Sequence, residues 1–275
     1  MESLVEINRP EERKANCSVE LKNVNLIYKN GKEYSNVLNN IELKLFDDDF
    51  VCVLGPSGCG KTSLLNAIAG YNTDISGQVL INGAPHTKPN PDVGVVFQQP
   101  NIFPWLSVEK NIEFGLKMKK IPKKERAEIV NHYVDLVGLE KARKLLPHQL
   151  SGGMKQRAAI ARTLAADSKV VLLDEPFSAL DALTREAMQK HLKKIWKETN
   201  KCFFFITHDV EEAILLSTRI IVMNANPGRI VSDFKNPLQQ DDDNSLKKIR
   251  SSEEFGELRD SLIELIQGND LENEV

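Results

Sequence analysis

Five short apolar runs constrain the fold of this chain more than any other feature of its sequence. Helix-like stretches separate most of them. Strands that are buried on both faces have such continuous apolar runs, whereas strands with one face in water alternate apolar and polar residues. The runs therefore predict parallel strands in an α/β core. They are VCVL at 51–54, VGVVF at 93–97, VVLL at 170–173, CFFFI at 202–206 and RIIVM at 219–223.

The segments around these runs have other patterns. Apolar residues alternate with polar ones at Val19 and Leu21, and again from Ile41 to Leu45, which is typical of half-buried antiparallel strands. Between Pro104 and Pro147 the apolar residues have helical spacing. The predicted fold is α/β, with a mainly parallel sheet, an N-terminal antiparallel β subdomain and a helical subdomain inserted at about 104–165.

The chain divides by composition into three segments. Residues 1–18 are polar and aperiodic and predict a mobile arm, residues 19–237 form the main domain, and residues 238–275 begin as a charged linker. A helix follows the linker, with apolar residues at helical spacing. We expect this helix to cover the chain's own core, with a regulatory role as the alternative. Its apolar residues are Phe255, Leu258, Leu262, Leu265 and Ile266.

Charge and cysteine content exclude several classes of protein. The 275 residues include 36 basic and 39 acidic side chains with no basic stripe, so nucleic acid is not an expected partner. The four cysteines lack metal-ligand spacing, and the N-terminus lacks an apolar signal core, which together favour a reducing cytoplasm. No apolar run approaches the roughly 20 residues that a membrane-spanning helix needs. A role at a membrane would therefore require a partner.

The segment GPSGCGKT, from Gly55 to Thr62, carries the strongest chemical signal. It fits the pattern G-x-x-x-x-G-K-S/T, follows an apolar run and opens an apolar helix, the context in which backbone N–H groups and a helix start face one phosphate. Lys61 would reach the β and γ phosphates, and the Thr62 hydroxyl would bind Mg²⁺. Because Cys59 lies beside Lys61 and a helix start, we expect its thiol to have a lowered pKa and to react readily.

A site that hydrolyses a nucleotide also needs a metal-binding carboxylate and a general base. The run VVLL ends in Asp174 and Glu175, which places both at the carboxyl end of a predicted strand, where open α/β sheets bind ligands. We assign Asp174 to Mg²⁺ and Glu175 to the general base. His208 follows the run CFFFI and would hydrogen-bond the γ-phosphate.

The segment LSGGMKQR at 150–157 places two glycines at the start of a predicted helix. Ser151 is a good helix cap, and without side chains at Gly152 and Gly153 a phosphate could approach the bare N–H groups. The chain has one phosphate loop, which already has its own helix start. We therefore expect LSGGMKQR to face a nucleotide that is bound by another subunit.

Taken together, these motifs resemble the ATPase subunits of ATP-binding cassette (ABC) transporters over roughly residues 19–235. In that family two subunits bind two ATP molecules head to tail. The resemblance implies that Tyr28 stacks on adenine, that Gln98 contacts Mg²⁺ and the attacking water, and that Asp181 acts across the dimer. The expected catalytic residues are Lys61, Gln98, Glu175 and His208, and the expected Mg²⁺ ligands are Thr62, Gln98 and Asp174. The expected ATP-binding residues are Tyr28, Gly55, Pro56, Ser57, Gly58, Cys59, Gly60, Lys61, Thr62, Ser63, Ser151, Gly152, Gly153 and Asp181.

Further segments are similar to importer ATPases of the nitrate, sulfonate, taurine, bicarbonate and thiamine-precursor group. They are FPWLSVEKNI, FSALDALTRE, THDVEEAILLS and NPGRI, while Thr218 stands where that group usually has aspartate. The resemblance implies an ATPase at the cytoplasmic face of the cell membrane. Its expected partners are a second copy or a homologous ATPase subunit, transmembrane permease subunits and, indirectly, an extracytoplasmic solute-binding protein.

Two other functions remain open. The first is a soluble cassette ATPase that acts on ribosomes or DNA, although such proteins usually carry tandem cassettes or long coiled-coil inserts. The second is a nucleotide-gated regulatory subunit, against which the presence of Glu175 and His208 argues. The sequence does not identify the solute, because permeases and solute-binding proteins contact it.

Overall fold

The described residues of the computed structural model form two compact units, which we call unit 1 and unit 2. Unit 1 comprises residues 1–90 and 199–275, and unit 2 comprises residues 91–198. Most of the predicted N-terminal arm lies outside the described residues, although the first strand already begins at Cys17. The structure describes residues 16–30, 33–72, 74–199, 201–239 and 249–271.

Unit 1 contains the predicted antiparallel β layer. Its strand order is β2-β1-β4-β5, and β1 pairs antiparallel with both β2 and β4. The alternation seen in the sequence places Val19, Leu21 and Leu43 in the core and leaves Lys22 and Lys44 exposed. The strands are β1 (Cys17–Asn30), β2 (Glu33–Phe46), β4 (Ile75–Ile81) and β5 (Ala84–Pro85).

In a second set of strands in unit 1, most residues are buried. β3 (Phe50–Leu54) lies between β8 (Cys202–Ile206) and β9 (Arg219–Asn224) and is parallel to both, while β10 (Arg229–Lys235) pairs antiparallel with β9. Every residue of β3 and β8 is buried, as their continuous apolar runs predict. Helix α1 (Lys61–Ala69) follows β3, and α6 (Val210–Leu216) follows β8.

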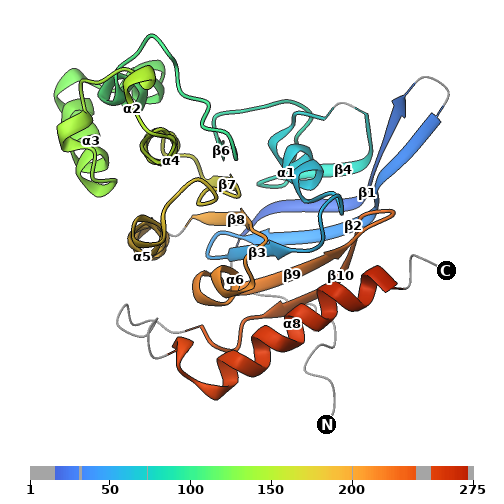
Figure 1. The fold of residues 1–275 in the computed structure, drawn as a ribbon. Coiled ribbons are helices and arrows are strands. Elements are labelled where there is room, and N and C mark those ends of the chain that lie inside the picture. Colours follow the sequence, from blue (N-terminus) through green and yellow to red (C-terminus); the bar gives the residue numbers. More distant parts are fainter. Residues whose placement is uncertain (1–15, 31–32, 73, 200, 240–248, 272–275) are drawn as a thin grey trace. The chain divides into compact units, whose positions relative to one another are not determined.

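The C-terminal helix α8 (Glu253–Leu271) packs against α6 and β9 (Figure 1). Phe255, Leu258 and Leu262 are the buried residues of this contact, at the helical spacing seen in the sequence. The helix therefore covers the chain's own core, as expected. Within the described residues, no helix combines the length and the apolar character that are needed to span a membrane.

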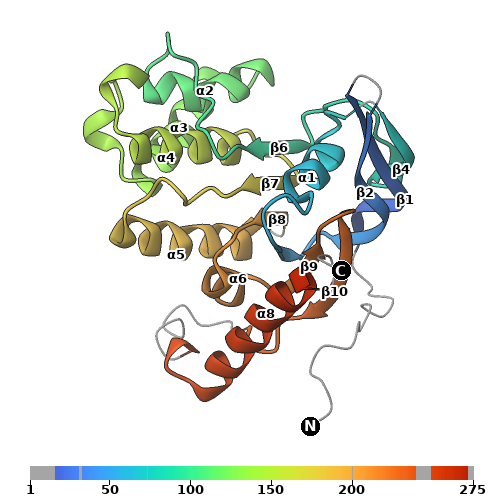
Figure 2. The ribbon, with the colours of Figure 1, turned by 45° about the vertical axis from the view of Figure 1, so that its right-hand side comes forward.

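Unit 2 contains a pair of parallel strands and the predicted helices. β6 (Val93–Val96) pairs with β7 (Val170–Asp174), and α2, α3 and α4 pack on one another (Figure 2). The helices are α2 (Val108–Met118), α3 (Lys123–Leu136), α4 (Gly152–Ala165) and α5 (Ala182–Thr199). Two 3₁₀ turns, Glu140–Ala142 and Pro147–Gln149, lie between α3 and α4.

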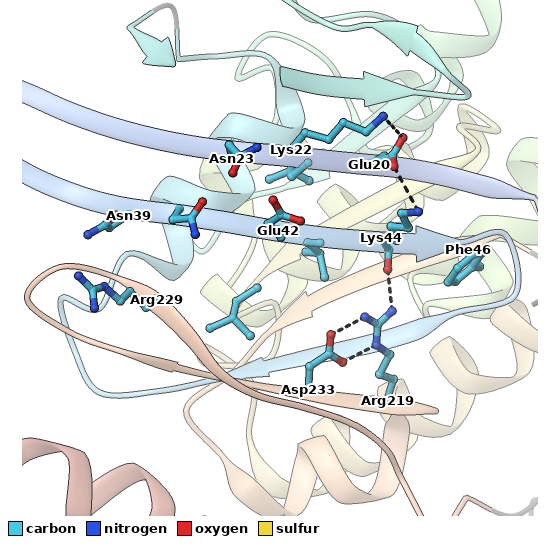
Figure 3. Close-up of a pocket in the computed structure, with 14 residues that line it drawn as sticks. Glu20, Lys22, Asn23, Asn39, Glu42, Lys44, Phe46, Arg219, Arg229 and Asp233 are labelled. Carbon is cyan, nitrogen blue, oxygen red and sulfur yellow. Dashed lines mark hydrogen bonds and ion pairs between the residues drawn. The ribbon is translucent and has the colours of Figure 1, made fainter. Parts of the chain in front are cut away.

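A buried arginine links β9 to three other segments of unit 1. The guanidinium of Arg219 donates to both carboxylate oxygens of Asp233 at 2.6 and 2.5 Å and to the Lys44 carbonyl at 2.7 Å (Figure 3). It also donates to the Asp49 carboxylate at 3.2 Å. The side chains of Arg219 and Asp49 are 3% and 0% exposed. Burial alone would lower the pKa of Arg219, but the two carboxylates raise it above its usual value. Arg219 therefore connects β9 to β2 by a hydrogen bond and to β10 by an ion pair.

Beside this arginine lies a cavity of about 900 Å³, with β1 and β2 on one side and β10 on the other (Figure 3). Much of its charge is internally paired, because Glu20 binds Lys22 and Lys44 while Arg219 binds Asp233. None of the site residues predicted from the sequence lines it. Thr218, the residue before Arg219, holds the start of β3 in place. Its hydroxyl accepts from the Phe50 N–H at 3.0 Å.

We predict that Arg219→Met lowers the free energy of unfolding by about 3–5 kcal/mol, because it leaves two buried carboxylates without their countercharge. Denaturant unfolding followed by circular dichroism measures this loss. Arg250→Met is the matched control, since its ion pair with Glu211 is 45% and 40% exposed and should contribute at most about 1 kcal/mol. Equal losses for the two variants would contradict the role assigned to Arg219.

Candidate nucleotide site

The phosphate loop of unit 1 joins β3 to α1, as the sequence predicts. Gly58 and Gly60 have φ angles of 81° and 93°, in the left-handed region that favours glycine. Gly60 is the residue before α1, so the loop leads directly into the helix start. Ser57, Gly58 and Thr62 are exposed along this turn. The loop therefore presents backbone N–H groups and the positive end of a helix at the surface of unit 1.

Lys61 folds back over the loop that precedes it. Its Nζ donates to the carbonyl oxygens of Gly55 at 2.7 Å and Pro56 at 2.9 Å. These two bonds hold the ammonium group at the mouth of the loop, where a phosphate oxygen would compete with the carbonyls for it.

Cys59 differs from the expectation of a reactive thiol. The residue is completely buried, and burial raises the pKa of its thiol, an effect that the nearby Lys61 ammonium offsets only in part. The expectation was wrong because it counted the helix start and the lysine but not the loss of water around the sulfur. Cys59 therefore belongs to the packed underside of the loop.

His208 and the phosphate loop follow neighbouring parallel strands of unit 1. Val53 of β3 pairs with Ile206 of β8, and the Thr207 N–H donates to the Val53 carbonyl at 3.3 Å. Because parallel strands end at the same edge of a sheet, Gly55 and His208 leave their strands together. His208 is exposed, in agreement with a role in binding.

Tyr28 of β1 is 43% exposed and is available for stacking. Its hydroxyl lies 3.5 Å from the side-chain oxygen of Asn72, whose amide donates to the Ser63 carbonyl at 3.3 Å. Asn72 thus lies between the predicted adenine-stacking residue and the helix of the phosphate loop. This contact was not predictable from local patterns, since it joins positions 44 residues apart.

Gln98 and Glu175 meet in unit 2. Val96 of β6 pairs with Leu173 of β7, so both residues follow the carboxyl ends of parallel strands. The Gln98 Nε2 donates to the Glu175 Oε2 at 2.9 Å. This bond orients the glutamate carboxylate and leaves the amide oxygen of Gln98 as a potential ligand.

Glu175 also has an unusual backbone. Its φ angle is 44°, a region that costs energy for a residue with a side chain and that is often found at functional sites. The preceding Asp174 ends β7 and is 7% exposed. The chain therefore turns sharply between a buried carboxylate and a more accessible one.

The start of α4 has the geometry expected of LSGGMKQR. Ser151 caps the helix, its hydroxyl accepting from the Met154 N–H at 3.3 Å. A Cβ added to Gly152 would meet nothing within 4 Å, so space is open beside the first N–H groups. Asp181 similarly accepts from the Thr184 N–H at 3.0 Å near the start of α5, and this bond lowers the pKa of Asp181.

Unit 2 contains an apolar groove of about 700 Å³, lined by residues both before and after Gln98 in the chain. Phe103 is one of its lining residues, with the rings of Phe114 and Trp105 at 4.5 and 5.6 Å and the Arg162 guanidinium at 5.4 Å. Trp105 is 71% exposed, so it is not part of the core. Phe114 and Arg162 come from α2 and α4, so no short segment of the sequence indicates their contact with Phe103.

The donors at these positions suit Mg²⁺. Thr62, Gln98 and Asp174 offer hydroxyl, amide and carboxylate oxygens, the hard ligands that Mg²⁺ prefers. Among the described residues, no cluster of three or more His, Cys, Asp or Glu side chains could hold a metal alone.

Comparison with known proteins gives consistent matches. The family model described as ABC transporter matches residues 38–178, and a P-loop domain model matches residues 124–233. A taurine import ATP-binding protein of Roseobacter denitrificans is 44% identical over 88% of this chain and 90% of its own length. A nitrate import ATP-binding protein of Synechocystis is 40% identical over 92% of this chain and 97% of its own length.

A solved structure has the same fold. It is a dimeric ATP-binding cassette in a post-hydrolysis state, bound to ADP and Pi, and it is 34% identical to this chain. The TM-score is 0.73, and the match covers 81% of this chain and 99% of the other.

From the burial of Cys59 we predict slow labelling by N-ethylmaleimide at pH 7, slower than that of the partly exposed Cys17. Because thiolate is the reactive form and the pKa of Cys59 is raised, its labelling should accelerate as the pH rises above about 9. Peptide mass spectrometry over a time course measures each thiol. The buried Cys52 and Cys202 serve as internal controls, and faster labelling of Cys59 than of Cys17 at pH 7 would refute the prediction.

Proposed function

Because this chain belongs to the family of ABC transporter ATP-binding proteins, which hydrolyse ATP to drive transport, we propose that it powers the uptake of a small solute through separate permease subunits. The proposed solute is of the nitrate, sulfonate, taurine, bicarbonate or thiamine-precursor type. The names of the taurine and nitrate relatives support an importer of this group. The hydrogen bond between Gln98 and Glu175 is the observation that carries the proposal, since nucleotide binding alone needs no oriented base.

In the proposed reaction, Glu175 accepts a proton from a water molecule. The water oxygen forms a bond to the γ-phosphorus of ATP as the bond to the ADP oxygen breaks, giving ADP and phosphate. The loop N–H groups and Lys61 bind the phosphates, and His208 donates a hydrogen bond to the γ-phosphate. Thr62, Gln98 and Asp174 would hold Mg²⁺, which would supply positive charge against the charge that develops on the phosphate oxygens.

The proposed assembly pairs two ATPase subunits. We assign Ser151, Gly152 and Gly153 to the γ-phosphate that a second copy, or a homologous subunit, holds in its own phosphate loop. The open space beside Gly152 supports this assignment, because a phosphate can approach the helix start there. Asp181, near the start of α5, would act across the same interface between the two ATPase subunits.

The apolar groove of unit 2 is the proposed docking site for a permease helix. Met118 lines the groove and is 60% exposed, and Trp105, whose ring lies 5.6 Å from that of Phe103, is 71% exposed. Both side chains are costly to leave in water. Docking there would place the ATPase at the cytoplasmic face of the membrane. A solute-binding protein would meet the permease on the other side and would select the solute.

Uptake of labelled solutes by cells that lack this chain tests the function. We expect uptake of one member of the proposed group to be lost, to return with the wild-type chain and to stay absent with Glu175→Gln. That variant keeps the size of the side chain but cannot act as a base, so hydrolysis should fall by about 10²- to 10⁴-fold. Unchanged uptake of every solute, with the chain sedimenting with ribosomes, would instead support a soluble cassette ATPase.

The same cells test the docking groove. Trp105→Asp should abolish uptake while the purified protein retains its ATPase activity, because a charge beside the groove opposes docking of an apolar helix. Tyr34→Asp is the matched control: Tyr34 is an aromatic residue of unit 1 that is 69% exposed, and it should leave uptake unchanged.

Dimerisation tests the role of LSGGMKQR. Glu175→Gln should bind ATP without hydrolysing it and should therefore become a dimer only when ATP is present. Adding Ser151→Glu should abolish that dimer, since the longer anionic side chain would meet the partner's phosphate while leaving the chain's own phosphate loop intact. Size-exclusion chromatography with light scattering measures both. A double variant that still dimerises with ATP would contradict the assignment.

A further inference from the structure

The turn that carries His208 is held by hydrogen bonds on both sides of the histidine. The Thr207 hydroxyl accepts from the Asp209 N–H at 3.0 Å, so it bridges the residue between them. The Asp209 carboxylate accepts from the N–H groups of Glu211 at 2.9 Å and Glu212 at 3.2 Å, which caps α6. His208 is thus an exposed residue between two neighbours whose side chains are fixed.

The buried Glu212 determines in which direction the Thr207 hydroxyl donates its proton. The residue is 6% exposed, and its Oε2 accepts the Thr207 hydroxyl proton at 2.7 Å. A hydroxyl has one proton, so donation to Glu212 leaves its lone pairs free to accept from Asp209. A bond to a buried carboxylate is stronger than one between neutral groups. The carboxylate therefore locks the hydroxyl in the orientation that the turn requires.

Both ends of the turn are anchored in unit 1. The Thr207 N–H donates to the Val53 carbonyl of β3, the strand that leads into the phosphate loop. On the other side, α6 packs against α8, and Arg250 forms an ion pair with Glu211 at 3.3 Å. The turn is therefore tied to the strand before the phosphate loop and to a helix that another helix covers.

We propose that Thr207 and Glu212 are positioning residues that hold the His208 backbone in the conformation that presents its imidazole to the γ-phosphate. The proposal rests on the role given above to His208. Neither residue touches ATP in this proposal. Both act through the turn, so their loss should slow hydrolysis without weakening nucleotide binding.

Thr207→Val tests the proposal, because it removes the hydroxyl and nearly keeps the shape. We expect kcat for ATP hydrolysis by the purified full-length chain to fall about tenfold, the worth of one such hydrogen bond, with KM and the affinity for a non-hydrolysable ATP analogue unchanged. Thr207→Ser retains the hydroxyl and should restore activity to near the wild-type level. An unchanged kcat for Thr207→Val would overturn the proposal.

Two further variants separate positioning from general stability. Thr218→Val is the matched control, since it removes another buried threonine hydroxyl that binds the backbone of β3, and we expect it to leave kcat unchanged. Glu212→Gln keeps the shape but offers a neutral, weaker acceptor, so kcat should fall less than with Thr207→Val. This milder variant decides the question if Thr207→Val does not fold, and a wild-type kcat for it would then overturn the proposal.

A double-mutant cycle identifies the residue through which Thr207 acts. In a His208→Ala background, adding Thr207→Val should cause no further loss of kcat, because the residue that it positions is already gone. A further tenfold loss would overturn the proposal. Full activity of His208→Ala alone would instead contradict the role of His208, while failure of the uptake experiment would leave these kinetic results untouched.

Discussion

Direct contact between backbones holds the phosphate loop in place, and the candidate site of unit 1 depends on it. A Cβ on Gly55 would lie 2.4 Å from the Met223 carbonyl oxygen of β9, and one on Gly228 would lie 2.4 Å from the Cys59 carbonyl oxygen. No side chain fits at either point. Gly228 also exchanges backbone hydrogen bonds with β2, donating to the Val37 carbonyl and accepting from the Asn39 N–H. The segment NPGRI, for which the sequence indicates only a family resemblance, therefore packs directly against the backbone of the phosphate loop.

In each unit, the parallel direction of two neighbouring strands places the candidate site residues at one edge of the sheet. In unit 1, parallel β3 and β8 release the phosphate loop and His208 at one edge. In unit 2, parallel β6 and β7 release Gln98 and Glu175 at one edge, where they form a 2.9 Å hydrogen bond. Residues that are 77 positions apart in sequence meet because strand order, not chain proximity, decides which loops are neighbours.

Local signals in the sequence predicted β1, β2, the five strands with continuous apolar runs, the phosphate loop and the capped start of α4, but not β4, β5 or β10. Each of these depends on neighbours along the chain, such as the continuous apolar run before Gly55 or the serine before two glycines. Contacts over long distances were not predictable in this way. The burial that raises the pKa of Cys59, and the pairing of Arg219 with Asp49 across 170 positions, depend on which segments pack together. The bond by which the buried Glu212 orients the Thr207 hydroxyl also had no signal in the sequence.

The described residues of unit 2 contain a short structural path between the proposed permease groove and the proposed base. Phe97 lines the groove, and its carbonyl accepts from the Gln156 side chain at 3.1 Å. Gln156 lies on α4, one turn after the glycines assigned to a partner's phosphate. The next residue along the chain from Phe97 is Gln98, which binds Glu175. A helix docked in the groove and a phosphate at the start of α4 would therefore both act on the consecutive residues Phe97 and Gln98. Such a path would allow the chain to couple hydrolysis to a permease without itself contacting the solute.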